Sequence, residues 1–362
     1  MRPIVMPPNI IDHFYLGGER IAELRGVDMP SPRRPEEWLA ATTNRAGEPG
    51  VGPSRTDTGE LLRDLIAADA IGWLGSGAGP AGDNGILVKL LDPGQRLPVH
   101  VHPDRAFAAS HLDCPYGKTE AWFVLATSGD QPSVWLGWTQ DVDADELARR
   151  VEAQDSEWML SRMNRIAVSP GDGILVPAGT AHAIGAGVFV AEVQEPTDFS
   201  ILLEWSVTTA TREESHLDLG MPLALRATER GALLPDELAA LVTHTDLDGT
   251  APGPQRLLPE RADAFFRLDL LAPDANTEPG IPGGFAVAVV LEGTGEMRSA
   301  TDAVPASRGQ VFAVPAAFGD WSVAGDVRVI SCRPGASWPE SLSQPQPQLQ
   351  PGADSAYAEP PA

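Results

Sequence analysis

Residues 171–182 read Gly-Asp-Gly-Ile-Leu-Val-Pro-Ala-Gly-Thr-Ala-His, and residues 94–102 read Gly-Gln-Arg-Leu-Pro-Val-His-Val-His. Both stretches begin at a turn residue, pass through apolar residues and end on histidine. Short β-like runs of the same kind surround them between residues 86 and 205, separated by Gly, Pro and Asp. Apolar runs bounded by turn residues are typical of strands, so the sequence predicts a mainly β protein.

The histidines of these stretches are spaced for metal binding. His100 and His102 are two residues apart on a predicted strand, which places both imidazoles on one face. Glu120 begins the next predicted strand, and His182 follows the turn at Pro177. Three imidazoles and one carboxylate suit a divalent ion such as zinc, iron or manganese. We therefore predict that His100, His102, Glu120 and His182 bind a metal ion.

The spacing resembles the two sequence motifs of the cupin superfamily. A glycine followed after five residues by His-x-His (94–102) is similar to the first motif, and Gly, five residues, Pro-x-Gly-x-x-His (171–182) is similar to the second. Residues 309–317, Gly-Gln-Val-Phe-Ala-Val-Pro-Ala-Ala, repeat the Gly-strand-Pro pattern, but no histidine follows them. The resemblance implies tandem cupin (jelly-roll β-barrel) domains with a few helices inserted, the second without a metal.

The order of these signals predicts three regions. We expect a metal-binding cupin domain with N-terminal and inserted helices over residues 1–212, and a second, degenerate cupin-like β domain over residues 213–339. Residues 340–362 are rich in Pro and Gln, which predicts a disordered tail. Proline followed by two acids at 35–38 predicts the start of a helix, and residues 143–162 predict one or two more.

Charge and cysteine content limit the classes of binding partner and the cellular location that we expect. The 362 residues carry a net charge of -24, and an acidic surface repels nucleic acid and anionic lipid. We therefore expect no nucleic-acid or membrane partner, and no run of about 18 apolar residues occurs. Cys114 and Cys332 are expected to be two isolated thiols, with one long-range disulfide between them as the alternative. These features favour a cytoplasmic protein that is a monomer or a small homo-oligomer and acts on small molecules.

A second resemblance concerns function. Residues 97–105, Leu-Pro-Val-His-Val-His-Pro-Asp-Arg, and residues 116–125, Tyr-Gly-Lys-Thr-Glu-Ala-Trp-Phe-Val-Leu, resemble the H-P-D/N and G-K-T-E-x-W motifs of the type I phosphomannose isomerases. The resemblance is strong over residues 14–205. It implies a metal-dependent aldose–ketose isomerase that acts on a sugar phosphate of the mannose 6-phosphate/fructose 6-phosphate type, or on a related sugar, through a cis-enediol. It also implies one zinc ion, with His100 in place of the family's glutamine ligand.

Two further residues are candidates for the reaction. Lys118 lies two residues before Glu120, so on a strand the two side chains share a face. A nearby metal charge would favour a neutral amine, which makes Lys118 a candidate acid/base or substrate binder; the alternative is a surface lysine. Arg105 follows His-Pro-Asp, where the family often has a phosphate-contacting lysine. We take Arg105 as a candidate substrate-binding residue, with an exposed helix-start residue as the alternative.

Departures from the family pattern keep other functions open. The family has an arginine that projects into the site after its E-x-Q segment, whereas this chain has leucines at 202–203. Three histidines with one glutamate are also the usual ligands of cupin oxygenases that use iron or manganese. The missing arginine motivates a third hypothesis, a non-catalytic sugar-binding or regulatory cupin.

Overall fold

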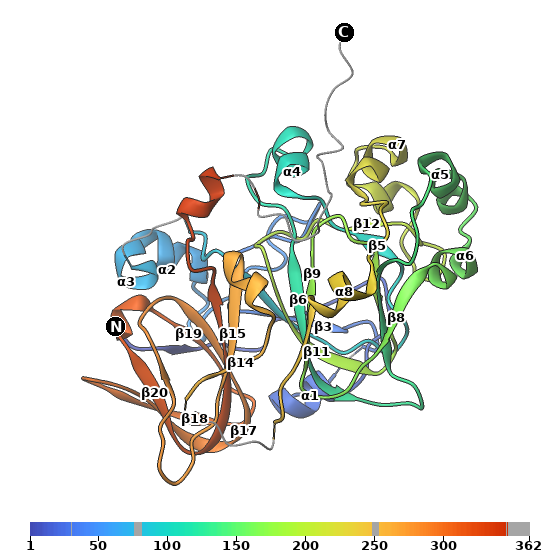
Figure 1. The fold of residues 1–362 in the computed structure, drawn as a ribbon. Coiled ribbons are helices and arrows are strands. Elements are labelled where there is room, and N and C mark those ends of the chain that lie inside the picture. Colours follow the sequence, from blue (N-terminus) through green and yellow to red (C-terminus); the bar gives the residue numbers. More distant parts are fainter. Residues whose placement is uncertain (30, 76–81, 248–252, 345, 347–362) are drawn as a thin grey trace.

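The computed structural model describes residues 1–362 except 30, 76–81, 248–252, 345 and 347–362. The protein is mainly β, as the sequence predicts, with three antiparallel sheets and short helices (Figure 1). Two of the sheets are built from strands between residues 10 and 244, and the third is built from β1 and strands between residues 255 and 334.

The first two sheets enclose a barrel interior, because side chains from both line one pocket. The larger sheet has the order β13-β9-β6-β11-β4-β3-β2, with bounds β2 (Ile10–Ile11), β3 (Glu36–Leu39), β4 (Leu87–Leu91), β6 (Glu120–Thr127), β9 (Asp172–Val176), β11 (Val188–Gln194) and β13 (Val242–His244). The smaller sheet has the order β12-β5-β10-β7-β8, with bounds β5 (His100–Val101), β7 (Ser133–Trp138), β8 (Met163–Ala167), β10 (His182–Ile184) and β12 (Ile201–Leu202).

The larger sheet is buried on both faces, and its register decides which residues face the pocket. Side chains alternate between the two faces along each strand. One face turns into the barrel and carries the cross-strand row Trp38, Lys89, Glu192, Trp122 and Ile174. The opposite face carries the adjoining row Leu39, Val88, Val193, Ala121 and Leu175. Charged residues therefore stand on strands that have no solvent-facing side.

The second β unit covers the apolar face of that sheet. Its eight strands have the order β1-β19-β17-β20-β15-β14, with β16 beside β20 and β18 beside β17. Their bounds are β1 (Ile4–Val5), β14 (Gln255–Arg256), β15 (Phe266–Leu271), β16 (Gly280–Ile281), β17 (Ala286–Ser299), β18 (Ala303–Ser307), β19 (Val311–Val314) and β20 (Trp321–Pro334). The first strand of the chain thus completes the sheet of the last strands.

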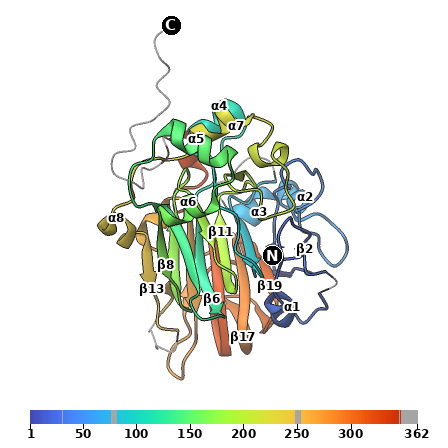
Figure 2. The same ribbon diagram turned by 90° about the vertical axis from the view of Figure 1, so that its right-hand side faces the viewer.

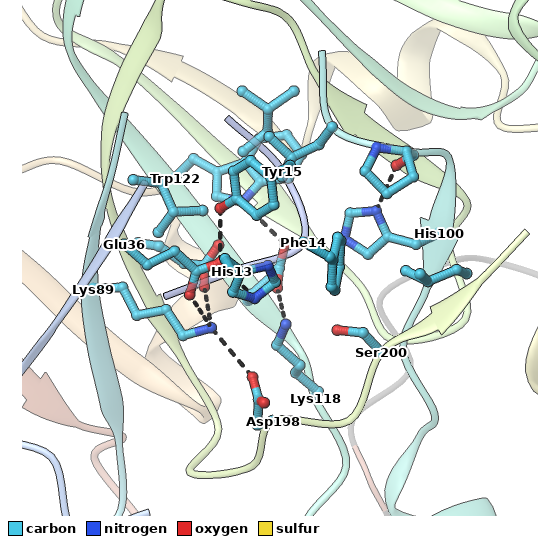
Figure 3. A pocket seen from close by; sticks show the side chains of 17 residues that line it. His13, Phe14, Tyr15, Glu36, Lys89, His100, Lys118, Trp122, Asp198 and Ser200 are labelled. Carbon is cyan, nitrogen blue, oxygen red and sulfur yellow. Dashed lines mark hydrogen bonds and ion pairs between the residues drawn. The ribbon is translucent and has the colours of Figure 1, made fainter. Parts of the chain in front are cut away.

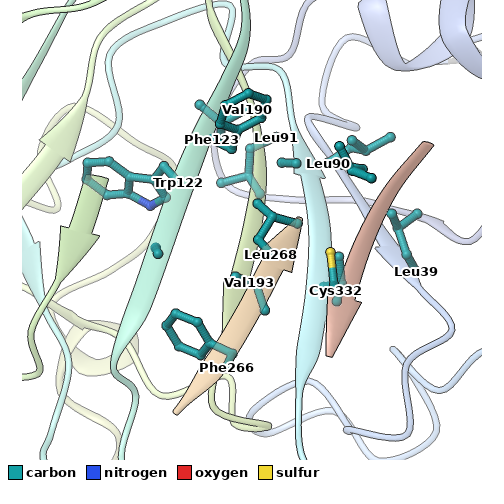
Figure 4. Close-up of a cluster of buried hydrophobic side chains, with 14 of the residues drawn as sticks. Leu39, Leu90, Leu91, Trp122, Phe123, Val190, Val193, Phe266, Leu268 and Cys332 are labelled. Atoms are coloured by element: carbon teal, nitrogen blue, oxygen red, sulfur yellow. The ribbon is translucent and has the colours of Figure 1, made fainter. Parts of the chain in front are cut away.

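Apolar side chains hold the two units together. Phe266, Leu268 and Cys332 of the second unit lie beside Leu39 and Leu90 of the first (Figure 4). Burial of each large apolar side chain stabilises the fold by roughly 1.5–3 kcal/mol. This shared core fixes the outer face of the sheet whose inner face bears the site.

The helices are short, and they lie mainly at the edges of the sheets. Helices α4, α5 and α7 gather at one end of the first barrel in both views (Figures 1 and 2). The bounds are α1 (Arg20–Arg25), α2 (Leu62–Ala68), α3 (Ala70–Leu74), α4 (Arg105–His111), α5 (Ala144–Glu152), α6 (Ser156–Ser161), α7 (Met221–Ala224) and α8 (Pro235–Ala239). The 3-10 turns are η1 (Glu213–His216), η2 (Leu225–Ala227), η3 (Glu260–Ala264), η4 (Ala316–Phe318) and η5 (Glu340–Ser343). No helix of the described residues is long and apolar enough to cross a membrane.

The helix prediction for residues 143–162 is confirmed, and the one for residues 35–38 is wrong. Residues 143–162 contain α5 and α6, whose first turns are capped by the carboxylates of Asp143 and Asp155. The helix expected from 35–38 is instead strand β3. Acidic residues after a proline are a local signal, and pairing of β3 with strands on both of its edges overrides that signal.

The segment that follows the first barrel packs back onto it. Met221 and Ala224 of α7 are buried in the same core as Val99 and Trp138, and β13 extends the larger sheet by pairing with β9. Residues 213–244, expected at the start of the second domain, therefore lie against the first barrel. Of the tail predicted over residues 340–362, η5 forms a 3-10 turn, and residues 345 and 347–362 lie outside the described part of the chain.

The contact between the two units yields a test at Gly173 of β9. A Cβ there would lie 1.9 Å from the carbonyl oxygen of Leu257, so the backbones must shift to admit it. We expect Gly173→Ala to lower the free energy of unfolding by about 1–3 kcal/mol, measured by denaturant titration. Gly253→Ala is the control, because a Cβ there meets no atom within 4 Å. Equal effects of the two substitutions would contradict this packing.

Candidate metal centre

The four predicted ligands meet inside the first barrel, between its two sheets. His100 and His182 are cross-strand neighbours on β5 and β10, and His102 follows β5. Glu120 enters from the facing sheet, at the start of β6. One ligand nitrogen from each histidine lies within 4.8 Å of the other two, and all three residues are buried. Such a group can hold a metal ion.

Backbone carbonyls orient the three imidazoles. The Nδ1 atoms of His100, His102 and His182 lie 2.8, 2.7 and 2.7 Å from the carbonyl oxygens of Pro98, Phe199 and Thr180. A carbonyl oxygen only accepts, so each Nδ1 carries the proton and donates it. Each Nε2 then presents a lone pair to the centre of the group. This is the way in which backbone partners orient metal-binding imidazoles.

Glu120 completes the group with an anionic oxygen. The indole Nε1 of Trp122 donates to its Oε1 at 3.0 Å, while its Oε2 lies 2.9 Å from Nε2 of His102. Nε2 of His182 is buried and makes no hydrogen bond to any described residue. An unpaired buried nitrogen is costly in the protein alone, and a cation at the centre would satisfy it.

The ionisation states also fit a divalent ion. Burial lowers the pKa of His102 and of His182 to about 3, and it lowers the pKa of His100 well below its usual value. Burial alone would raise the pKa of Glu120, but Lys118 and His102 outweigh it and hold that pKa well below its usual range. Three neutral imidazoles and a carboxylate are the forms in which these residues bind metals.

Lys118 lies directly beside these ligands. Its Nζ is 3.1 Å from Oε2 of Glu120 and 3.1 Å from Nε2 of His102. The side chain is only 4% exposed, so it is not a surface lysine. The strand geometry expected from the spacing of Lys118 and Glu120 therefore brings the amine into the pocket.

Arg105 lies elsewhere. It begins helix α4 and is buried, with Nε 2.6 Å from Oε1 of Glu195 and Nη1 3.0 Å from the carbonyl oxygen of Ser341. Its guanidinium also stands over the ring of Phe265. Arg105 is not among the residues that line the pocket. The structure thus gives it an internal ion pair rather than a place beside the other predicted site residues.

The pocket extends from the metal ligands to a second charged cluster, which sequence reasoning missed (Figure 3). The space between its lining atoms, together with its opening to solvent, is about 450 Å³. At its centre, Nζ of Lys89 lies 3.3 Å from Glu36, 3.7 Å from Glu192 and 3.5 Å from Asp198. His13 lies 3.3 Å from Glu36 on the other side. We call Lys89, Glu36, Glu192 and Asp198 the Lys89 cluster.

Composition carries a signal for this cluster. Lys89 and Lys118 are the only two lysines in the sequence, whereas arginine occurs 24 times. Both lysines are buried and line the same pocket. Lysine offers a compact charge that can lose its proton, which arginine does not. A lysine within the apolar run of β4, in a chain that otherwise uses arginine, therefore marks a position of special chemistry.

Mutual interactions set the ionisation of this region. Burial would lower the pKa of Lys89, but Glu36, Glu192 and Asp198 outweigh it and raise that pKa. Burial, with the charge of Glu120, raises the pKa of Glu192 to about 8 against the opposing effect of Lys89. Burial lowers the pKa of His13 to about 4, although Glu36 opposes this. At neutral pH, Lys89 is a cation and His13 is neutral.

The metal site can be tested without any assay of activity. We expect His182→Ala to weaken zinc binding at least about tenfold, because it removes one ligand nitrogen from the centre. Isothermal titration with zinc measures the change. The matched control is His244→Gln, since His244 is exposed and pairs with Asp172 far from the pocket. Unchanged zinc affinity in His182→Ala would show that the three histidines are not a metal site.

His13 makes the fold sensitive to acid. Its pKa is about 4 in the folded chain against 6.5 as the ordinary value, so the unfolded chain binds more protons between these pH values. Stability from this group is therefore lost as the pH falls, by about 2 kcal/mol between pH 7 and pH 5. We expect His13→Gln to lose that much less stability over this interval, measured by denaturant unfolding at both pH values. Identical pH dependence of the two proteins would contradict the prediction.

Comparison with known proteins shows which of them this chain resembles in sequence. The chain is 33% identical over 185 residues to the mannose-6-phosphate isomerase of Streptococcus mutans, and 32% identical over 198 residues to the probable mannose-6-phosphate isomerase GmuF of Bacillus subtilis. These matches cover 50% and 54% of this chain and 54% and 59% of the relatives, so they span little more than half the length of either. Mannose-6-phosphate isomerase ManA of Bacillus subtilis is 26% identical over 336 residues, or 89% of this chain and 96% of that protein. No family model matches the chain.

Solved structures agree on the fold. The mannose 6-phosphate isomerase of Bacillus subtilis superimposes with a TM-score of 0.71 at 22% identity and covers 92% of this chain and 100% of its own. A mannose 6-phosphate isomerase crystallised with zinc and yttrium gives a TM-score of 0.69 at 16% identity, with 92% of this chain and 100% of that one covered. The prediction of a tandem cupin fold is thereby confirmed. In sequence the chain is thus similar to mannose-6-phosphate isomerases, and it shares the fold of the solved ones.

Proposed function

We propose that the protein is a metal-dependent aldose–ketose isomerase that acts on a sugar of the mannose 6-phosphate/fructose 6-phosphate type, or on a related sugar, through a cis-enediol. One observation carries this proposal. The buried amine of Lys118 lies 3.1 Å from Glu120 and 3.1 Å from His102, and His102 is one of three buried histidines that could hold a metal ion. The names of the sequence relatives support the same reaction.

The reaction moves one proton between C1 and C2 on one face of the sugar. Lys118 is the candidate for this transfer, because its Nζ opens to the pocket and can hold or release a proton there. Its two neighbours, Glu120 and His102, fix the position of the amine. A zinc ion, when bound by the three histidines and Glu120, would polarise the oxygen atoms at the reacting carbons.

The other pocket residues hold the sugar in place. Carboxylates of the Lys89 cluster accept hydrogen bonds from hydroxyl groups, and their pairing with Lys89 keeps them in fixed positions. The near-complete burial of the lining excludes water from the enediol. Zinc is the proposed ion, with iron and manganese as alternatives, because the donor set suits all three. The names of the relatives do not favour the alternative of a cupin oxygenase.

Cysteine chemistry supports an intracellular site of action. Cys114 and Cys332 are both free thiols, and unpaired thiols are typical of a reducing compartment. We therefore propose that the enzyme acts in the cytoplasm on a small-molecule sugar, as a monomer or a small homo-oligomer.

Substitution of Lys118 tests the proposed proton transfer. We expect Lys118→Gln to lower kcat/KM for aldose–ketose interconversion at least about a hundredfold, since general acid/base groups contribute 10²–10⁴-fold. Interconversion is followed by NMR for free and 6-phosphorylated hexoses with zinc present. Arg149→Gln is the control, because it removes one positive charge from an exposed helix position.

Metal dependence is tested in the same assay. A chelator should abolish turnover, and added zinc should restore it. Full activity of Lys118→Gln on every accepted sugar would exclude the acid/base role. Oxygen consumption by an iron-loaded protein that isomerises no sugar would support the oxygenase instead.

A further inference from the structure

The charge of the pocket points to the class of sugar that it accepts. Building on the proposed isomerase function, we propose that the pocket selects an unphosphorylated monosaccharide and discriminates against its 6-phosphate. The inference rests on the charged groups that line the pocket, on their existing partners and on the neutral remainder of the wall.

Carboxylates outnumber cations in the lining. The cations are Lys89 and Lys118, and the acids are Glu36, Glu120, Glu192 and Asp198. With all four acids ionised, a divalent ion at the histidines would only balance the charge of the lining. With a proton on Glu192, the same ion would leave a single positive charge. Against a phosphate dianion the pocket therefore offers at most one unit of positive charge, and both of its ammonium groups already face carboxylates.

Neither lysine is free to bind a phosphoryl group. Lys89 already faces three carboxylates, at 3.3, 3.7 and 3.5 Å from its Nζ. Lys118 faces Glu120 at 3.1 Å. Phosphate recognition usually relies on cations whose hydrogen bonds are available to the phosphate oxygens. A phosphoryl group at the Lys89 cluster would lie against the acids that surround that lysine.

Two arginines of the barrel, Arg105 and Arg96, are also paired with acids. Arg105 pairs with Glu195. Arg96 donates from both terminal nitrogens to Glu204, each at 2.7 Å. None of the residues that line this pocket is an arginine.

A third arginine lies near the wall behind His13. Arg45 acts electrostatically on His13, but its guanidinium is 3.2 Å from Glu48 and donates to the carbonyl oxygen of Asp12. Arg63 occupies an adjoining hollow on the far side of Asp198, where Asp83 also lies. Each of these cations therefore stands beside an acid and outside the pocket.

The remaining wall suits a neutral polyol. Leu202 is the cross-strand neighbour of His100, so its apolar side chain shares the face of that ligand. Phe14 and Tyr15 supply aromatic surface, and Ser200 supplies a hydroxyl. Apolar and aromatic walls with a few fixed hydrogen-bonding groups are typical of pockets for small neutral ligands. Paired carboxylates add acceptors for sugar hydroxyl groups.

The test compares a free sugar with its phosphate on the zinc-loaded full chain. Turnover and isothermal binding are both measured for mannose, mannose 6-phosphate and inorganic phosphate. We expect kcat/KM for mannose to exceed that for mannose 6-phosphate at least about tenfold, because like charges in a closed site disfavour the phosphate. We also expect inorganic phosphate not to compete. A preference for mannose 6-phosphate in turnover or in binding would overturn the inference.

Binding separates this inference from the proposed function. If mannose binds better than mannose 6-phosphate but neither turns over, the isomerase proposal fails and the selectivity stands. If neither sugar binds or reacts, the selectivity inference fails as well.

A variant tests the electrostatic cause. Asp198→Asn removes one carboxylate of the Lys89 cluster, and its amide oxygen can still accept from the backbone N–H of Ala46. We expect the ratio of affinities, 6-phosphate over free sugar, to rise about fivefold or more. Glu152→Gln, on the exposed side of helix α5, is the matched control and should leave the ratio unchanged. An unchanged ratio in Asp198→Asn would overturn the electrostatic explanation.

Discussion

Charge balance inside the first barrel is the constraint on which the site depends. The charged groups of the Lys89 cluster are too little exposed to water for any of them to be stable alone. Each therefore depends on an opposite charge nearby. Removal of one partner from such a buried pair costs about 3–5 kcal/mol, because an uncompensated charge remains. The same balance holds the polar groups in fixed positions before any sugar arrives. Stability and preorganisation therefore come from one set of contacts.

The residues of the candidate metal centre could be predicted because short spacings specify them. His-x-His on a strand and Pro-x-Gly-x-x-His across a tight turn are local patterns, and each sets the direction of its side chains without distant contacts. The position of Lys118 could be predicted for the same reason, since it lies two residues from Glu120. The structure brings these residues together, although zinc binding and catalysis by them stay predictions.

The Lys89 cluster could not be predicted in this way. Lys89 and Glu192 lie opposite each other on β4 and β11, about 100 residues apart in the chain, and Glu36 comes from a third strand. Their meeting depends on the register of a sheet that no local motif encodes. The helix expected from 35–38 failed for a related reason, because strand pairing decided the conformation. Arg105 follows the expected motif, but Glu195 draws its side chain into a buried ion pair.

The pairing of β1 with β19 has a consequence for how the chain reaches this structure. Ile4 and Val5 lie beside Ala313 and Phe312, so this strand can take its place only after residues 312 and 313 have been synthesised. Contacts between such distant segments form slowly, because closing the long loop between them costs entropy. During synthesis, the emerging N-terminal strand must remain unpaired while the first barrel assembles. Completion of the second sheet is therefore expected to be a late event, in which the two ends of the fold are joined.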